Sequence, residues 1–320
     1  MLALGTAAPL LLLIALLIDA IVDPARRVLP WLDRLVRIPG ENSSWVRARP
    51  ARERRLAGWG VLGGVLLVAL ILLFRLQSFV DRFPFGELGI AVLAAPFLPL
   101  RGTMRMIGLV RSGLAGGQPG VARDGLGGVM PWRSVAETPE GIGRQAIEAG
   151  VLGFAGAFLM PALAFLVMGL PGPVLWRLLV GLGSYNAAVP DRDRQFARAA
   201  DRTLLLLLYG PGWLAAWLFA LAGLLIRVPV RATLAHLERR TRHAEEPLAP
   251  AMDAMAHLAH VPLARPVLLR PGGEGGVIFN PGAEPADAAA VATVRTVLYG
   301  AIGLIVAVLG LVSALRLLIP

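Results

Sequence analysis

Long apolar runs alternate with polar, arginine-bearing segments along the whole chain. The clearest runs, each about 20 residues or longer, cover residues 4–22, 56–74 and 294–319. An α-helix rises 1.5 Å per residue, so about 20 apolar residues cross the roughly 30 Å hydrocarbon core of a bilayer. Weaker runs cover 88–100, 149–170 and 204–226. The pattern predicts an all-α, multi-pass helical integral membrane protein with about five to seven spans, some of them broken or re-entrant.

Three stretches contain a possible break or leave their route through the membrane undecided. Pro161 lies in the middle of the run at 149–170, which is tolerable in a span if neighbouring groups satisfy the freed carbonyls. The run at 204–226 contains Gly210-Pro211-Gly212, so it either crosses as one helix or turns there as a hairpin. Residues 172–190 hold a single charge, Arg177, and fit a short span, a re-entrant segment or an interfacial helix.

Arginine placement predicts the orientation. The loop at 23–55 holds nine arginines and the loop at 101–144 holds six. The positive-inside rule places both in the cytoplasm and the N-terminus outside. Beyond residue 170 the rule is ambiguous, because the two arginine-bearing segments 191–203 and 227–292 share a side only if 204–226 is a hairpin.

The predicted organisation is a single membrane domain over residues 1–320. Its extramembrane parts are arginine-rich cytoplasmic loops at 23–55 and 101–148, and a segment at 227–292 with an amphipathic helix and a Gly/Pro-rich loop. Within the second loop, the glycine-rich stretch 113–128 matches no phosphate-binding motif and is typical of a flexible connector.

Composition narrows the chemistry further. The chain is 56% hydrophobic and 16% charged, and it has neither lysine nor cysteine. Lysine Schiff bases, cysteine nucleophiles, Fe–S clusters and cysteine zinc sites are therefore excluded. The net charge of +10 comes from arginines beside apolar runs. It predicts contact with a lipid bilayer rather than with nucleic acid, since no nucleic-acid-binding motif accompanies it.

A few ionisable residues are candidates for chemistry. Glu148 stands at the mouth of an apolar run, where an acid either has a function or stabilises the first turn of a helix. His257 and His260 are three residues apart, with Asp253 one turn earlier, a set that can hold a divalent metal. No motif frames this pair, so we expect a solvated surface pair and predict no metal site.

The order of several short motifs resembles a known family. The motifs are Leu17-Ile18-Asp19 followed by Asp23-Pro24, an Arg144-x-x-x-Glu148 helix leading to Pro161, and a small-residue, Met-Ala-rich stretch at 247–262. Without gaps, the register of the second motif continues through Trp176-Arg177 and Ser184 to Arg202 and Pro211. Together they resemble the CobD/CbiB family of adenosylcobinamide-phosphate synthases, and the resemblance implies a protein of the bacterial inner membrane.

The resemblance also implies a chemistry, and the chain departs from it. The family joins an aminopropanol phosphate to a corrinoid carboxylate using ATP, and such chemistry needs carboxylates to hold Mg²⁺. The family's Gly-Arg-Asp-Thr falls on residues 131–134, and its Ala-Glu-Asn and following Asp fall on 151–153 and Gly156. Its Asn-Thr-x-Asp-Ser falls on 180–184. The two aspartates and the asparagine of its Asp-Asp-x-x-Asn fall on Leu204, Leu205 and Leu208. A catalytically degenerate member is predicted, with ATP and Mg²⁺ as cofactors only if the family reaction is retained.

The residues that would act, if any do, follow from the same register. Asp23 and Glu148 would be the catalytic acids, and Arg144, Arg202 and Ser184 would contact an anion. Corrinoids or other cobalamin-pathway proteins are the implied partners. Two alternatives stay open: a non-catalytic membrane scaffold or regulator resembling the AmpE-type proteins, and a small-molecule transporter, since broken helices often line substrate sites.

Overall fold

The described part of the chain folds almost entirely into helices. The computed structural model describes residues 4–26, 28–30, 50–127, 136, 138–187, 194–231, 233–235, 247–264 and 278–318. Within these residues the only strands are β1 (Leu263–Ala264) and β2 (Ile278–Phe279), which pair antiparallel. The longer helices are α1 (Leu4–Val22), α4 (Ala51–Val80), α6 (Leu100–Ala115), α8 (Pro139–Leu152), α10 (Pro171–Ala187), α11 (Arg194–Leu225) and α14 (Ala288–Leu318). The shorter ones are α5 (Gly86–Ala94), the 3₁₀ turn η1 (Ala95–Phe97), α7 (Pro119–Gly127), the π-helix η2 (Gly153–Leu159), α9 (Met160–Met168) and α13 (Ala249–Leu258).

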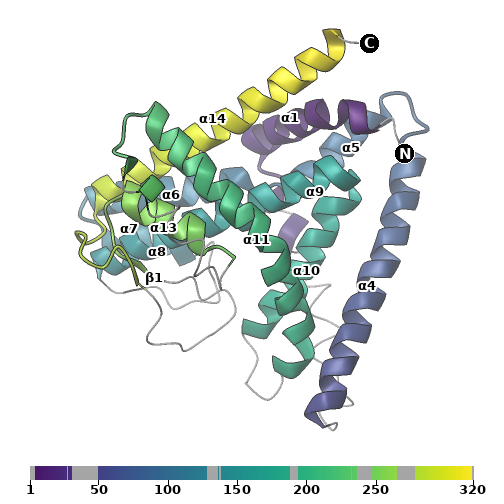
Figure 1. Ribbon diagram of the computed structural model, residues 1–320. Coiled ribbons are helices and arrows are strands. Elements are labelled where there is room, and N and C mark those ends of the chain that lie inside the picture. Colours follow the sequence, from purple (N-terminus) through teal and green to yellow (C-terminus); the bar gives the residue numbers. More distant parts are fainter. Residues whose placement is uncertain are drawn as a thin grey trace.

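The prediction of an all-α, multi-pass membrane protein is confirmed. In the part of the chain that the structure describes, five helical stretches are long and apolar enough to cross a bilayer: Arg52–Val80, Gly86–Ala115, Pro139–Met168, Arg198–Leu225 and Ala288–Arg316. A shorter apolar helix covers Ala7–Val22. Figure 1 shows α4 along one edge of the molecule. The C-terminal end of α14 projects beyond the other helices. Large apolar side chains of α4 such as Leu67, Ile71 and Phe79 are exposed, as expected for a helix that faces lipid.

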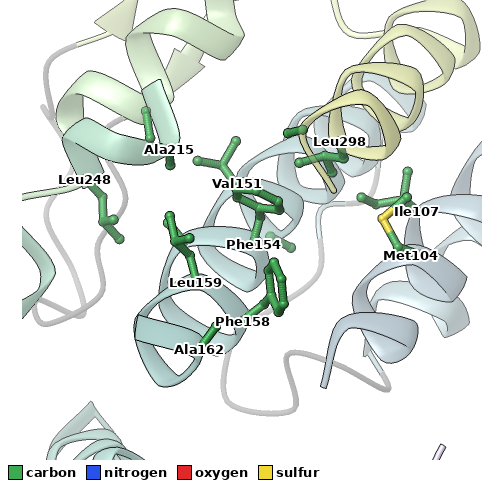
Figure 2. Close-up of a cluster of buried hydrophobic side chains, with 14 of the residues drawn as sticks. Met104, Ile107, Val151, Phe154, Phe158, Leu159, Ala162, Ala215, Leu248 and Leu298 are labelled. Carbon is green, nitrogen blue, oxygen red and sulfur yellow. The ribbon is translucent and has the colours of Figure 1, made fainter. Parts of the chain in front are cut away.

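The core lies around the continuous segment α8–η2–α9. Helices α6 and α14 pack against α8, and α6 and α11 pack against η2. Figure 2 shows Phe154 and Phe158 of η2 between two groups of apolar side chains, Ala215 and Leu248 on one side and Met104, Ile107 and Leu298 on the other. The Phe154 ring also meets Phe219 of α11 at 5.1 Å between centroids. One apolar core therefore joins helices that are far apart in the sequence.

The structure differs from the sequence-based expectation at 101–127 and 139–148, the described parts of the predicted loop, which are mostly helical rather than irregular. In α6, Met104, Ile107 and Val110 are buried, whereas Arg101 and Arg105 are exposed. This spacing of three and four residues produces one apolar face, and the arginines on the other face obscured it. The glycine-rich stretch at 113–128 is not a flexible connector throughout, because most of it forms α7, which packs against α6.

The hairpin alternative at 204–226 is wrong. Helix α11 runs without a break from Arg194 to Leu225, with Pro211 inside it. Residues 172–187 of the undecided segment 172–190 belong to one helix, α10, which packs on α4, α9 and α11. The buried side chain of Gln77 in α4 accepts a hydrogen bond from the Leu170 N–H at 3.1 Å, which ties α4 to the start of α10.

Pro161 is accommodated by a π-helix and a tryptophan. In η2 the backbone bonds reach five residues back, so the Met160 N–H donates to the carbonyl of Ala155. The next bond of this pattern would join residue 161 to the Gly156 carbonyl, but proline has no N–H. The indole Nε1 of Trp176, on α10, donates to that carbonyl at 2.7 Å. A neighbouring helix thus satisfies the group that the proline frees.

Replacing Trp176 by phenylalanine should lower the free energy of unfolding by about 1–2 kcal/mol, because the Gly156 carbonyl loses its donor inside the protein. SDS-induced unfolding in mixed micelles measures the change. The matched control is Trp217→Phe, since Trp217 lies on α11 with 46% of its surface exposed. Equal losses in the two variants would contradict the assigned role of the indole.

Candidate functional site

The acids at the end of α1 have different environments. Asp19 is 1% exposed, and its Oδ2 accepts hydrogen bonds from the backbone N–H groups of Leu100 at 3.1 Å and Arg101 at 2.9 Å. Pro99 precedes α6 and offers no side-chain cap, so Asp19 caps that helix from α1. The Arg101 guanidinium donates in return to the Ile21 carbonyl at the end of α1. Asp23, the predicted catalytic acid, lies just beyond this contact, partly exposed and with a φ of 52°.

Arg144 and Glu148 lie one turn apart on α8. Arg144 is exposed, whereas Glu148 is fully buried. Helix α8 begins at Pro139 and is capped by Thr138, whose hydroxyl accepts from the Gly141 N–H at 3.1 Å. Glu148 is therefore well past the first turn, and stabilisation of a helix N-terminus does not explain it. A buried carboxylate at the start of an apolar segment remains a functional candidate.

Arg202 and Ser184 belong to the neighbouring helices α11 and α10. Arg202 is exposed, and Ser184 lies in α10 with its side chain outside the described residues. Next to Ser184, a Cβ added to Gly183 would overlap Leu204 and lie 3.2 Å from Asp201 Oδ1. Asp201 is a half-buried acid that the sequence analysis missed. Its position directly before the apolar run of α11 was the available signal.

Four positions at which the family that the sequence resembles has polar residues lie in contact in two pairs. Gly183 packs against Leu204, and a Cβ on Gly156 would be 3.7 Å from the Leu208 side chain. Leu204 and Leu208 are 5% and 4% exposed, so η2, α10 and α11 join here through apolar contacts. Apart from Asp201, whose Oδ1 lies beside Gly183, these contacts are apolar where Mg²⁺ and ATP would need several carboxylates, and the residues present do not fit these groups.

The histidines do not form the solvated pair that was expected. His257 is 8% exposed, and its Nδ1 lies 2.9 Å from the Asp253 carbonyl and 3.6 Å from Asp253 Oδ1. Helix α13 ends at Leu258, and His260 follows it, exposed and with a φ of 52°. The helical spacing of the two imidazoles is therefore broken. Among the residues that the structure describes, no three His, Asp or Glu side chains are grouped to hold a metal.

An acidic hollow lies where α8 and α14 begin. Its volume is about 350 Å³, and it is lined by Leu114, Pro139, Glu140, Glu284, Pro285, Ala286, Asp287 and Ala288. Asp287 caps α14 by accepting from the Ala290 N–H at 2.7 Å. A Cβ on Gly143 would be 2.5 Å from the Ala286 carbonyl oxygen, so the two helix starts are in close contact. The segments 101–148 and 227–292, whose relation the sequence left open, thus meet at their ends.

The five predicted site residues lie on three parts of the fold. Asp23 follows α1, Arg144 and Glu148 share α8, and Ser184 and Arg202 belong to the adjacent α10 and α11. No family model, characterised protein or solved structure matches the chain. The site is therefore interpreted from its own geometry.

Proposed function

We propose that the chain is a membrane protein with a CobD/CbiB-like scaffold that has lost the amide-forming site of the synthases of cobalamin biosynthesis. The observation that supports this most is the meeting of Gly156 with Leu208 and of Gly183 with Leu204. The four positions come from three separate segments and were aligned on the family's polar motifs by sequence register alone. Their proximity is what a shared scaffold would produce.

The chemistry of these positions argues against catalysis. Transfer involving ATP phosphates requires oxygen ligands that hold Mg²⁺ at close, fixed positions. Leucine and glycine side chains cannot supply them, and Leu204 and Leu208 are buried among apolar neighbours. The role that remains is a non-catalytic membrane partner in the cobalamin pathway, which would contact a corrinoid or the proteins that handle it.

Complementation tests the catalytic part. A bacterial strain that lacks the synthase and expresses this chain should not grow on cobyric acid plus aminopropanol. The same strain with a complete synthase gene is the control, and membrane insertion of the chain is verified by fractionation. Growth, or corrinoid-dependent ATP hydrolysis by the purified chain, would contradict the proposal.

Corrinoid binding tests the pathway part separately. The purified chain in lipid nanodiscs should bind adenosylcobyric acid, followed by the corrinoid absorbance, without consuming ATP. Absence of binding together with absence of growth would leave the chain non-catalytic but remove its link to corrinoids.

A further inference from the structure

Two neighbouring helical segments, α8–η2–α9 and α14, change from charged to uncharged sequence at the same level along their length, beside Gly150 and Leu298. After Glu148, residues 149–168 of α8–η2–α9 carry no charge, and after Arg295, residues 296–315 of α14 carry none. A Cβ on Gly150 would be 3.5 Å from the Leu298 side chain, so both runs begin side by side. Each run is 20 residues long. That length corresponds to about 30 Å of helix, the thickness of a hydrocarbon core.

Helix α6 meets the two runs at the same level and leads away from them. A Cβ on Gly150 would also be 2.8 Å from Ile107, and one on Gly153 would be 2.5 Å from Thr103. The far end of α6 instead reaches the acidic hollow, where Leu114 lies beside Pro139. The crossing that begins at Gly86 therefore ends near Ile107 in the middle of α6, and the second half of α6 lies beyond the apolar runs.

The exposed charges near this level differ in sign from those of the hollow, whereas the nearby acids Asp19 and Glu148 are buried. Arg101 and Arg105 lie on the exposed face of α6 close to it, and Arg111 follows on an exposed position. The acids Glu140, Glu284 and Asp287 gather at the hollow. Glu140 precedes Gly150 by ten residues, about 15 Å of helix, which exceeds the Debye length of about 8–10 Å at physiological ionic strength.

We propose that this level is the surface of an anionic lipid leaflet and that the exposed arginine face of α6 (Arg101, Arg105 and Arg111) contacts its phosphate headgroups. Basic side chains near such a surface are attracted within a Debye length, whereas the acids of the hollow lie beyond it. Helix α6 then passes through the membrane surface, with its apolar face on the protein core and its basic face toward the lipid headgroups. The proposal depends on the chain being a membrane protein and is independent of its relation to corrinoid synthases.

Lipid preference tests the headgroup contact. Spin-labelled phosphatidylglycerol in a phosphatidylcholine bilayer should associate with the protein more strongly than spin-labelled phosphatidylcholine. The double variant Arg105→Gln, Arg111→Gln should reduce this preference by roughly fivefold for each arginine removed. Arg105→Lys with Arg111→Lys keeps the charge and should preserve the preference. An unchanged preference in the glutamine variant, or displacement of the lipid by inorganic phosphate, would overturn the proposal.

Depth measurements test the level itself. The chain has no cysteine, so single cysteines carrying nitroxide labels can be introduced without other changes. Labels at the exposed positions Gly303 and Val308 of α14 should be accessible to oxygen, and a label at Ala289 should be accessible to a water-soluble relaxant. A label at Leu109, 39% exposed on α6, should resemble the one at Ala289 or lie at headgroup depth. A Leu109 label as deep as the one at Val308 would place α6 in the hydrocarbon and refute the proposal.

Discussion

Replacing Asp19 by alanine should lower the free energy of unfolding by about 2–5 kcal/mol, because two N–H groups at the start of α6 lose a charged acceptor. The carboxylate is 1% exposed, so water has little access to replace it. Leu100 and Arg101 lie 81 and 82 positions after Asp19 in the sequence, so loss of these bonds also loosens the attachment of α1 to α6. SDS-induced unfolding gives the free energy, and hydrogen exchange of the first α6 amides should rise in the variant.

Two other variants separate capping from a general effect of removing an acid. Asp19→Asn keeps one carbonyl oxygen that can accept both bonds, so its loss should be clearly smaller than that of Asp19→Ala. Asp23→Asn keeps a residue type that tolerates the φ of 52° and alters a partly exposed side chain, so its effect should stay within about 0.5 kcal/mol. If Asp23→Asn were the more damaging substitution, the assignment of the anchoring role to Asp19 would be wrong.

Hydropathy predicted the apolar helices wherever the apolar run was uninterrupted. The runs at 4–22, 56–74 and 294–319 correspond to α1, α4 and α14. Periodicity was the missing criterion for α6, because its buried positions recur every three to four residues while its average hydropathy is lowered by arginines. The Gly/Pro content of α11 was misleading for a different reason: proline inside a membrane helix is tolerated when packing supports the helix.

The candidate site was predictable only in part. Sequence spacing places Arg144 and Glu148 on one side of a helix, but it does not say that one is exposed and the other buried. Burial of Glu148 depends on the helices packed around α8, which the local pattern does not encode. The same holds for the acids of α1, since Asp19 rather than Asp23 is buried only because α6 docks there. The family register, by contrast, identified glycines and leucines that meet in space.

Replacing Gly212 by alanine should destabilise the protein by about 3 kcal/mol, at the upper end of the range for overpacked sites. A Cβ at this position would overlap the carbonyl oxygen of Pro247 and lie 2.8 Å from its carbonyl carbon. The obstacle is backbone at the start of the segment that leads into α13, so no side-chain rotation can relieve it. Helix α11 would have to separate from α13, against which it packs extensively. Thermal unfolding in detergent and SDS titration both measure the loss.

Gly210 provides the matched control two residues away in the same helix. A Cβ there meets nothing within 4 Å, and the position is exposed. Alanine is favoured over glycine in a helix by about 1 kcal/mol, and its position before Pro211 reduces that gain, so Gly210→Ala should be neutral or stabilising by about 0.5 kcal/mol. A hairpin turning at Gly210-Pro211-Gly212 would instead require glycine for its turn, so alanine would be harmful at both positions. A loss of stability in Gly212→Ala without a loss in Gly210→Ala therefore supports a continuous α11. Equal losses of stability in the two variants would support the hairpin instead.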